Sequence, residues 1–206
     1  MSLLNLPSPL DSIFADTEDL PVFFERLTIA IVELLKCDRC YIYIRDPQFH
    51  NYQIPSCYCA RSEVPNIAQP QISTESHLLK ADPLFAAALN CKPTIFIEDT
   101  SEATTQCDRI ATKSHDASFQ LHFDKENSYS DRQNYLRHKA IVQAHICLEN
   151  QLWGIIRASQ FDRPRPWTKF DRSTISVVVD KITPLVSMYA RKELRGTIQV
   201  AHDGFQ

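Results

Sequence analysis

The chain has 206 residues, of which 44% are apolar and 23% charged, and its formal net charge is −3. This length and composition predict one globular domain with enough chain for a full core. The slightly negative charge and the lack of a long apolar run exclude a basic nucleic-acid-binding surface and a membrane span, so we expect neither nucleic acid nor membrane as a partner. The N-terminus does not resemble a secretory signal, which predicts a cytoplasmic protein.

The predicted elements begin with a loose polar arm over residues 1–19. A helix is expected over Pro21–Lys36, where apolar residues recur at helical spacing after a first-turn proline. A strand with two distinct faces follows at Cys40–Arg45. A second strand at Tyr52–Arg61 is expected at a sheet edge, because Pro55 cannot donate a ladder hydrogen bond.

The middle of the chain is less regular. Residues 62–80 are mixed and polar, which predicts a loop, and a short helix is expected over Pro83–Asn90. Thr94–Ile97 is a short apolar strand. Residues 99–128 are rich in Ser, Thr, Asp and His and predict a long functional or mobile loop, before a short helix over Asp131–His138.

The last third has the clearest pattern. Apolar and polar residues alternate over Ile141–Leu148, Glu149-Asn150 forms a turn, and a second strand returns over Gln151–Gln160. Thr168 begins a long helix in a pattern that resembles a capping box. A lone glycine, Gly154, marks a close approach within the second strand. Hairpins mixed with helices predict an α+β domain with an antiparallel sheet.

Several of these segments together resemble a known family. The segments LLKCDRCYIYIRD, NCKPTIFIEDTSEA and AIVQAHICLENQLWGIIRAS resemble a GAF domain, and QLWGIIRASQFDRPRPWTKFD is similar to the bilin-binding GAF domains of phytochromes and cyanobacteriochromes. The resemblance implies a GAF-like (profilin-like) fold, in which helices pack on a central antiparallel sheet and the terminal helices share one face. It also implies an N-terminal arm over 1–19, a GAF domain over 20–195 and a C-terminal tail over 196–206.

The motifs for bilin attachment are degraded. Those photoreceptors attach a linear tetrapyrrole through a Cys followed by His, and here Cys107 falls near the expected spacing but is followed by Asp108. Residues 108–131 have the character of an insertion, and Leu84 stands where a subgroup carries a second Cys. Ser159 replaces a His that often lines the pocket. We therefore expect no covalent bilin adduct.

The resemblance places a ligand pocket between one sheet face and residues 80–138. The cofactor is not identified by the sequence, and the candidates are a non-covalent small molecule or a linear tetrapyrrole. His145 points either into this pocket or toward the terminal helices, and Tyr135 either stacks on a flat ligand or belongs to the core. The candidate pocket residues are Cys107, Tyr135, His138, His145 and Ser159.

No metal and no catalysis are expected. Cys37, Cys40, Cys57 and Cys59 could supply four thiolates to zinc, but free cysteines in such a chain are more often buried thiols than ligands or disulfides. The sequence also lacks a Gly-rich phosphate loop, an H-E-x-x-H motif and a nucleophile elbow.

Three functions remain in competition. The sequence favours a GAF-type sensory and ligand-binding signalling module without catalytic output. The alternatives are a cyanobacteriochrome-like photoreceptor attached through Cys107, and a ligand-free module for dimerisation or partner docking. A homodimer through the terminal helices is expected, because Val177, Met188 and Leu194 lie off the apolar stripe of the last helix. A downstream signalling protein is the other expected partner.

Overall fold

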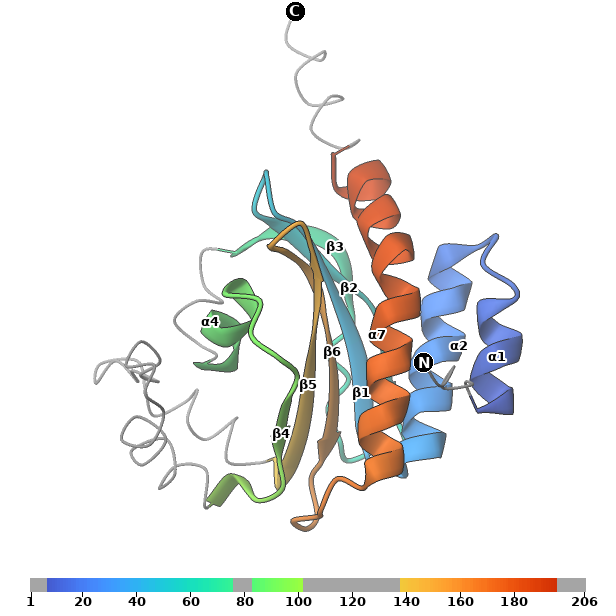
Figure 1. The fold of residues 1–206 in the computed structure, drawn as a ribbon, viewed down its shortest axis with the longest axis vertical. Coiled ribbons are helices and arrows are strands. Elements are labelled where there is room, and N and C mark those ends of the chain that lie inside the picture. The colour runs from blue at the N-terminus through green and yellow to red at the C-terminus, as the bar shows by residue number, and fades with distance from the viewer. Residues whose placement is uncertain (1–6, 76–82, 102–137, 196–206) are drawn as a thin grey trace, which may run out of the picture.

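The computed structural model describes residues 7–75, 83–101 and 138–195. A six-stranded antiparallel sheet with the strand order β3-β2-β1-β6-β5-β4 forms its centre. Helices α1, α2 and α7 lie on one side of the sheet and α4 lies on the other (Figure 1). The predicted α+β architecture is confirmed, with the terminal helices on one face.

The sheet is built from hairpins. β5 and β6 are joined by Glu149 and Asn150, both with positive φ (55° and 58°), as a tight hairpin turn requires. β1 lies between β2 and β6, so it is paired on both sides. The strands are β1 (Arg39–Asp46), β2 (Asn51–Cys59), β3 (Gln69–Thr74), β4 (Ile95–Ile97), β5 (Ala140–Leu148) and β6 (Gln151–Gln160).

The helices have well-defined ends. Asp19 caps α2 by accepting a hydrogen bond from the Val22 N–H, and Lys36 ends it in the left-handed conformation. The predicted capping box is confirmed at the start of α7, where Thr168 and Asp171 bond each other's backbone N–H groups. The helices are α1 (Ser8–Phe14), α2 (Leu20–Leu35), α4 (Pro83–Leu89) and α7 (Lys169–Tyr189), and a π-helical turn (Ala190–Leu194) follows α7.

Strand alternation divides the buried side chains into two clusters. On β1, Cys40, Ile42 and Ile44 belong to the large core under the terminal helices, whereas Tyr41 and Tyr43 belong to a smaller cluster on the opposite face. β5 alternates in the same way, because its core residues Val142, Ala144 and Ile146 alternate with polar residues on the face toward α4. The predicted two-faced strands are therefore confirmed.

Three expectations are corrected. The arm over residues 1–19 is not loose throughout, because Ser8–Phe14 forms α1 with Leu10 and Ile13 buried. β2 is an interior strand: Pro55 falls at a register shift in the β1–β2 ladder, where a bulge tolerates its missing N–H. Residues 62–80 include the edge strand β3. The expected helix over 131–138 and most of the 99–128 segment lie outside the described residues.

Candidate functional site

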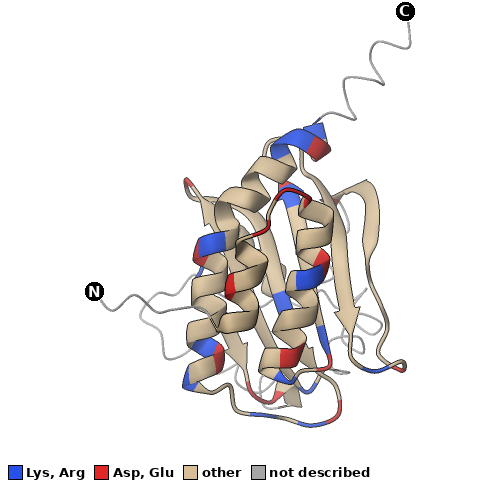
Figure 2. Cartoon of the chain, turned by 90° about the vertical axis from the view of Figure 1, so that its right-hand side faces the viewer, with Lys and Arg blue, Asp and Glu red and all other residues tan. Residues whose placement is uncertain are grey.

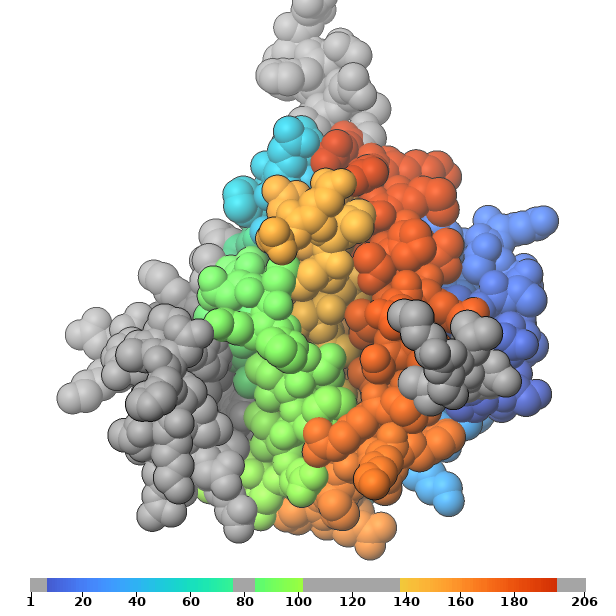
Figure 3. Space-filling model, viewed as in Figure 1, coloured from blue at the N-terminus to red at the C-terminus, as the bar shows by residue number. Residues whose placement is uncertain are grey.

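The candidate site is built on the sheet face that is turned away from α1, α2 and α7, here called the α4 face. Adjacent strands place their side chains on it in rows, because paired residues point to the same side. The rows run from Arg39 and Ser159, through Tyr41, Arg157 and Gln143, to Tyr43, Ile155 and His145. α4 and the chain leading to β4 cover part of this side of the sheet (Figures 1 and 3).

The part of the α4 face beneath α4 is filled by apolar side chains. The Tyr43 ring stacks on Tyr52 with centroids 5.1 Å apart and meets the edge of Phe85 at 5.6 Å. Ala88, Leu152 and Ile155 complete this cluster. Since these side chains pack against one another, this part of the face acts as core.

A buried ion pair closes the far end of the α4 face. Arg45 Nη2 donates to Glu75 Oε2 at 2.8 Å, and the Tyr43 hydroxyl donates to Glu75 Oε1 at 2.7 Å. Arg45 also donates to the Leu152 carbonyl. Burial, followed by the Glu75 charge, raises the pKa of Tyr43 well above its usual value. Arg45 and Glu75 neutralise each other's charge, so we assign this end of the face a structural role and not a ligand-binding one.

The opposite end of the α4 face holds a polar cluster of Arg39, His138 and Ser159. These residues are 4%, 8% and 0% exposed. Arg39 Nη1 donates to the Pro65 carbonyl at 2.9 Å, and Arg39 Nη2 donates to His138 Nε2 at 3.5 Å. The guanidinium also lies 4.8 Å from the centroid of the Phe161 ring, which holds it in one orientation.

The His138 imidazole is neutral. Burial, followed by the charges of Arg39 and Arg157, lowers the pKa of His138 from 6.5 to about 3. Because an arginine N–H can only donate, His138 Nε2 is the acceptor in their contact, and the proton is assigned to Nδ1. His138 Nδ1, Arg39 Nε and Ser159 Oγ are buried and have no hydrogen-bond partner among the described residues.

A chain of hydrogen bonds crosses the middle of the face. Arg157 donates to Gln143 Oε1, and Gln143 Nε2 donates to the Leu84 carbonyl at 2.8 Å and to His145 Nε2 at 3.0 Å. His145 Nδ1 donates to the Lys92 carbonyl at 2.6 Å. His145 therefore lies on the α4 face and not under the terminal helices, and both of its ring nitrogens bond to the protein.

His138 contacts Arg39, the strand partner of Ser159, and His145 lies two rows farther along the same face of the sheet. Cys107 and Tyr135 lie outside the described residues. Sequence reasoning missed Arg39 and Arg157, which add positive charge to this face beyond the ion-paired Arg45. The available signal for Arg39 was its place directly before the predicted strand Cys40–Arg45, because a charged residue next to an apolar strand is unusual in an ordinary core.

The structure bears on two hypotheses about cysteines, a second bilin-attaching thiol and a four-thiolate zinc site. Leu84, which the sequence resemblance places where a photoreceptor subgroup has its second Cys, is a buried residue of α4, 2% exposed. Cys37 and Cys40 belong to the core under the terminal helices, whereas Cys57 packs on the α4 face. These cysteines cannot converge on one zinc ion, and the described part of the chain holds no cluster of His, Cys, Asp and Glu suited to a metal.

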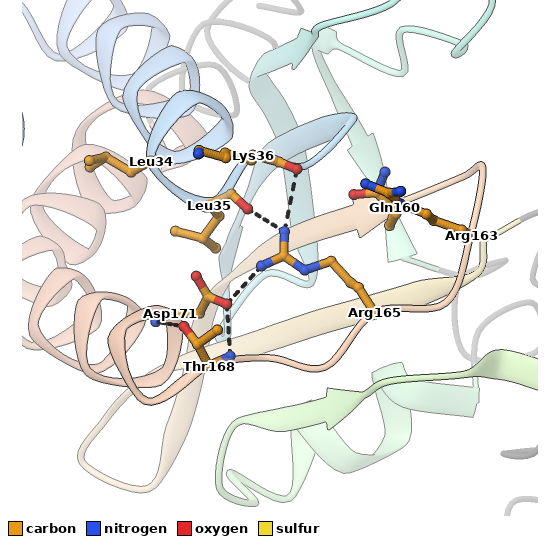
Figure 4. A pocket seen from close by; sticks show the side chains of 8 residues that line it. All are labelled: Leu34, Leu35, Lys36, Gln160, Arg163, Arg165, Thr168 and Asp171. Atoms are coloured by element: carbon orange, nitrogen blue, oxygen red, sulfur yellow. Dashed lines mark hydrogen bonds and ion pairs between the residues drawn. The ribbon is translucent and has the colours of Figure 1, made fainter.

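Away from the α4 face, a hollow of about 320 Å³ lies where α2 ends and α7 begins (Figure 4). Arg165 crosses it and donates to the carbonyl oxygens of Leu35 and Lys36 and to the Asp171 carboxylate. Asp171 also accepts from the Thr168 N–H. Because these charges are satisfied within the chain, the hollow is a structural joint between the two helices.

Comparisons with known proteins identify the fold independently. The sequence model of the GAF domain matches residues 19–184. The chromophore-binding domain of an unusual bacteriophytochrome from R. palustris superimposes with a TM-score of 0.62 at 16% identity, covering 88% of this chain. This chain spans 60% of the length of that domain.

Two single GAF domains are matched over nearly their whole length. The phycocyanobilin-bound GAF domain of a cyanobacterial phytochrome gives a TM-score of 0.60 at 18% identity and covers 93% of this chain and 97% of its own. The GAF domain of an Acinetobacter phosphoenolpyruvate-protein phosphotransferase gives 0.57 at 10% identity and covers 89% and 95%. These TM-scores, at low sequence identity, show a common fold. No relative was found among curated protein sequences. Among the described helices, none is long and apolar enough to cross a membrane.

Proposed function

Because the chain belongs to the GAF domain family, we propose that it is a cytoplasmic sensory module that binds a small molecule on its α4 face and has no catalytic output. The observation that carries the proposal is the polar cluster of Arg39, His138 and Ser159. Buried donors without an acceptor cost free energy, so such a cluster is expected where a ligand completes the hydrogen bonding.

We propose further that no covalent bilin adduct forms. Leu84 offers no thiol, and Cys107 is followed by Asp108 and not by His. Apart from attachment, the α4 face itself carries two guanidinium groups near the Tyr41 ring, those of Arg39 and Arg157.

Coexpression with the enzymes of bilin synthesis tests the adduct. We expect no zinc-dependent fluorescence from the denatured protein band and no visible absorption that survives denaturation. A coloured adduct that Cys107→Ala abolishes would contradict the proposal and favour the photoreceptor alternative.

Ligand binding itself is tested by native mass spectrometry of the purified protein. The expected result is a small molecule that is retained under native conditions and released on denaturation. If the spectrum shows only the mass of the unliganded protein, both before and after incubation in a cell extract, that result would favour the ligand-free alternative. That alternative is supported by the aromatic side chains that fill the face beneath α4.

The signal is proposed to leave through the helices. α2 and α7 pack on the opposite side of the same sheet, so a ligand on β1 and β6 lies one strand layer away from them (Figure 1). We propose that the signal passes to a homodimer interface formed by these helices and to a downstream signalling protein.

A further inference from the structure

We propose that Arg39, His138 and Ser159 form an anion subsite that seats the carboxylate of an organic acid. The inference rests on the proposed ligand-binding function and specifies the chemistry of the ligand. It concerns the end of the α4 face that α4 does not fill.

The first argument is the kind of hydrogen-bonding groups that are unsatisfied. Arg39 Nε–H and His138 Nδ1–H are donors, and the Ser159 hydroxyl can donate. None of the three is hydrogen-bonded to an acceptor among the described residues, and the neighbouring Gln160 Oε1, which is itself an acceptor, is buried without a partner as well. A set of buried donors is complementary to an acceptor-only group, and an ionised carboxylate is such a group.

The second argument is that these donors are neighbours. Arg39 and Ser159 are paired residues of the adjacent strands β1 and β6, so their side chains share one face. The Lys139 N–H donates to the Gln160 carbonyl at 2.7 Å, which fixes the chain at His138 beside the end of β6. His138 in turn contacts the Arg39 guanidinium.

The third argument is charge. Arg39 is almost fully buried, and in the described part of the chain its polar contacts are the Pro65 carbonyl and the neutral His138 ring. Arg157 adds a second guanidinium on the same face, 5.8 Å from the centroid of the Tyr41 ring that Arg39 also approaches. A buried cation without a counter-ion is unfavourable, and a bound anion offsets that cost.

The surroundings favour an organic acid over an inorganic anion. The Phe161 ring lies 4.5 Å from His138 and 4.8 Å from the Arg39 guanidinium, and Tyr41 lies in the next row. A ligand whose carboxylate occupies the cluster would therefore place its carbon skeleton beside aromatic rings.

Binding of three probes to the purified protein tests the proposal: benzoate, its neutral isostere benzamide, and inorganic phosphate, titrated at constant ionic strength by calorimetry. We expect benzoate to bind and benzamide and phosphate not to bind. Arg39→Gln should weaken benzoate binding about ten- to a hundredfold, because it removes charged hydrogen bonds. The matched control is Arg163→Gln, which changes an exposed arginine in the loop between β6 and α7 and should leave the affinity unchanged.

A second measurement keeps the test valid if Arg39→Gln fails to fold. Benzoate should shift the NMR signal of the His138 Nδ1 proton and slow its exchange with solvent in the native protein, and Ser159→Ala should weaken benzoate binding. Failure of benzoate to bind, equal binding of benzamide, or binding of phosphate alone would overturn the carboxylate subsite. A neutral ligand found by native mass spectrometry would overturn this inference while leaving the proposed sensory function intact.

Discussion

Arg39 illustrates how the fold holds a buried, charged side chain in place on the α4 face of the sheet. Its guanidinium lies 4.8 Å from the centroid of the Phe161 ring and 5.8 Å from that of Tyr41, and its Nη1 donates to the Pro65 carbonyl. These contacts fix the orientation of the Arg39 guanidinium group, so its Nε–H, which has no hydrogen-bond partner among the described residues, points in one direction. The residue is therefore preorganised for an acceptor, which lowers the entropic cost of binding.

Gly154 is a residue at which size alone matters. A Cβ added there would lie 2.6 Å from the Tyr43 carbonyl oxygen and 3.3 Å from side-chain carbons of Ile146 and Val186. The backbone oxygen of a doubly paired strand cannot easily move. We expect Gly154→Val to lower the free energy of unfolding by about 2–3 kcal/mol in urea denaturation. Gln151→Val, at an exposed position of the same strand, is the control, and an unchanged midpoint for Gly154→Val would contradict the prediction.

His138 makes stability depend on pH. Its pKa is about 3 when folded against 6.5 for the ordinary imidazole, so between these values the unfolded chain binds a proton that the folded chain does not. Stability from this group is therefore complete above pH 6.5 and is lost as the pH falls toward 3. We expect wild type to lose about 2 kcal/mol from this group between pH 7 and pH 5.

Urea unfolding of wild type and His138→Gln at both pH values measures this contribution. The variant should lose about 2 kcal/mol less than wild type over the same interval, because its amide does not titrate. Equal losses in the two proteins would show that His138 is not the group responsible.

At the scale of elements, the joint between α2 and α7 depends on one carboxylate. Asp171 accepts from the Thr168 N–H and from Arg165, and Arg165 bonds to the last carbonyls of α2 (Figure 4). The Arg165 guanidinium also lies 4.5 Å from the centroid of the Trp167 ring. The start of one terminal helix is thus fastened to the end of the other, so the two helices are expected to move together.

The cap of α7 gives a prediction for that joint. Thr168→Ala removes the hydroxyl that accepts from the Asp171 N–H, so we expect a loss of about 1 kcal/mol in the free energy of unfolding. Ser173→Ala is the matched control, because Ser173 bonds to a carbonyl inside the same helix and caps nothing. In thermal and urea unfolding, Thr168→Ala should be less stable than Ser173→Ala. The reverse order of stability would refute the role of the cap.

At the scale of the whole molecule, the two sheet faces differ in chemistry. One face is sealed by apolar side chains of α2 and α7, whereas the α4 face carries arginines, a buried ion pair and the polar cluster. On the helical side, positive and negative residues are interspersed (Figure 2). Binding and signal output are therefore expected on opposite sides of one sheet.

The expected dimer belongs to this scale and stays a prediction. Leu194 is fully buried within the chain, so it no longer argues for a partner, but Val22, Phe170 and Met188 on α2 and α7 are 46%, 49% and 52% exposed. We expect light scattering at high micromolar concentration to give a dimer mass, and Met188→Lys to shift the equilibrium toward monomer. The control is Gln71→Lys, which adds the same charge on the edge strand β3 and should leave the monomer–dimer equilibrium unchanged. A monomer mass for wild type would exclude the dimer.

Local patterns in the sequence determined the elements whose signals are short in range. Alternation on β1 and β5, the turn at Glu149 and Asn150, and the Thr168 cap each depend on neighbouring residues, and each is found where it was predicted. The GAF-like fold follows from the order of these elements and from the family resemblance.

Only the tertiary structure decided which residues meet. Pro55 lies in an interior strand because a bulge in the β1–β2 ladder accommodates it, and α1 forms because Leu10 and Ile13 find a core to enter. The polar cluster joins Arg39 to His138, 99 residues later in the chain. Such a contact depends on strand order and register, which no local pattern contains, and so the site emerges only when the sheet is assembled.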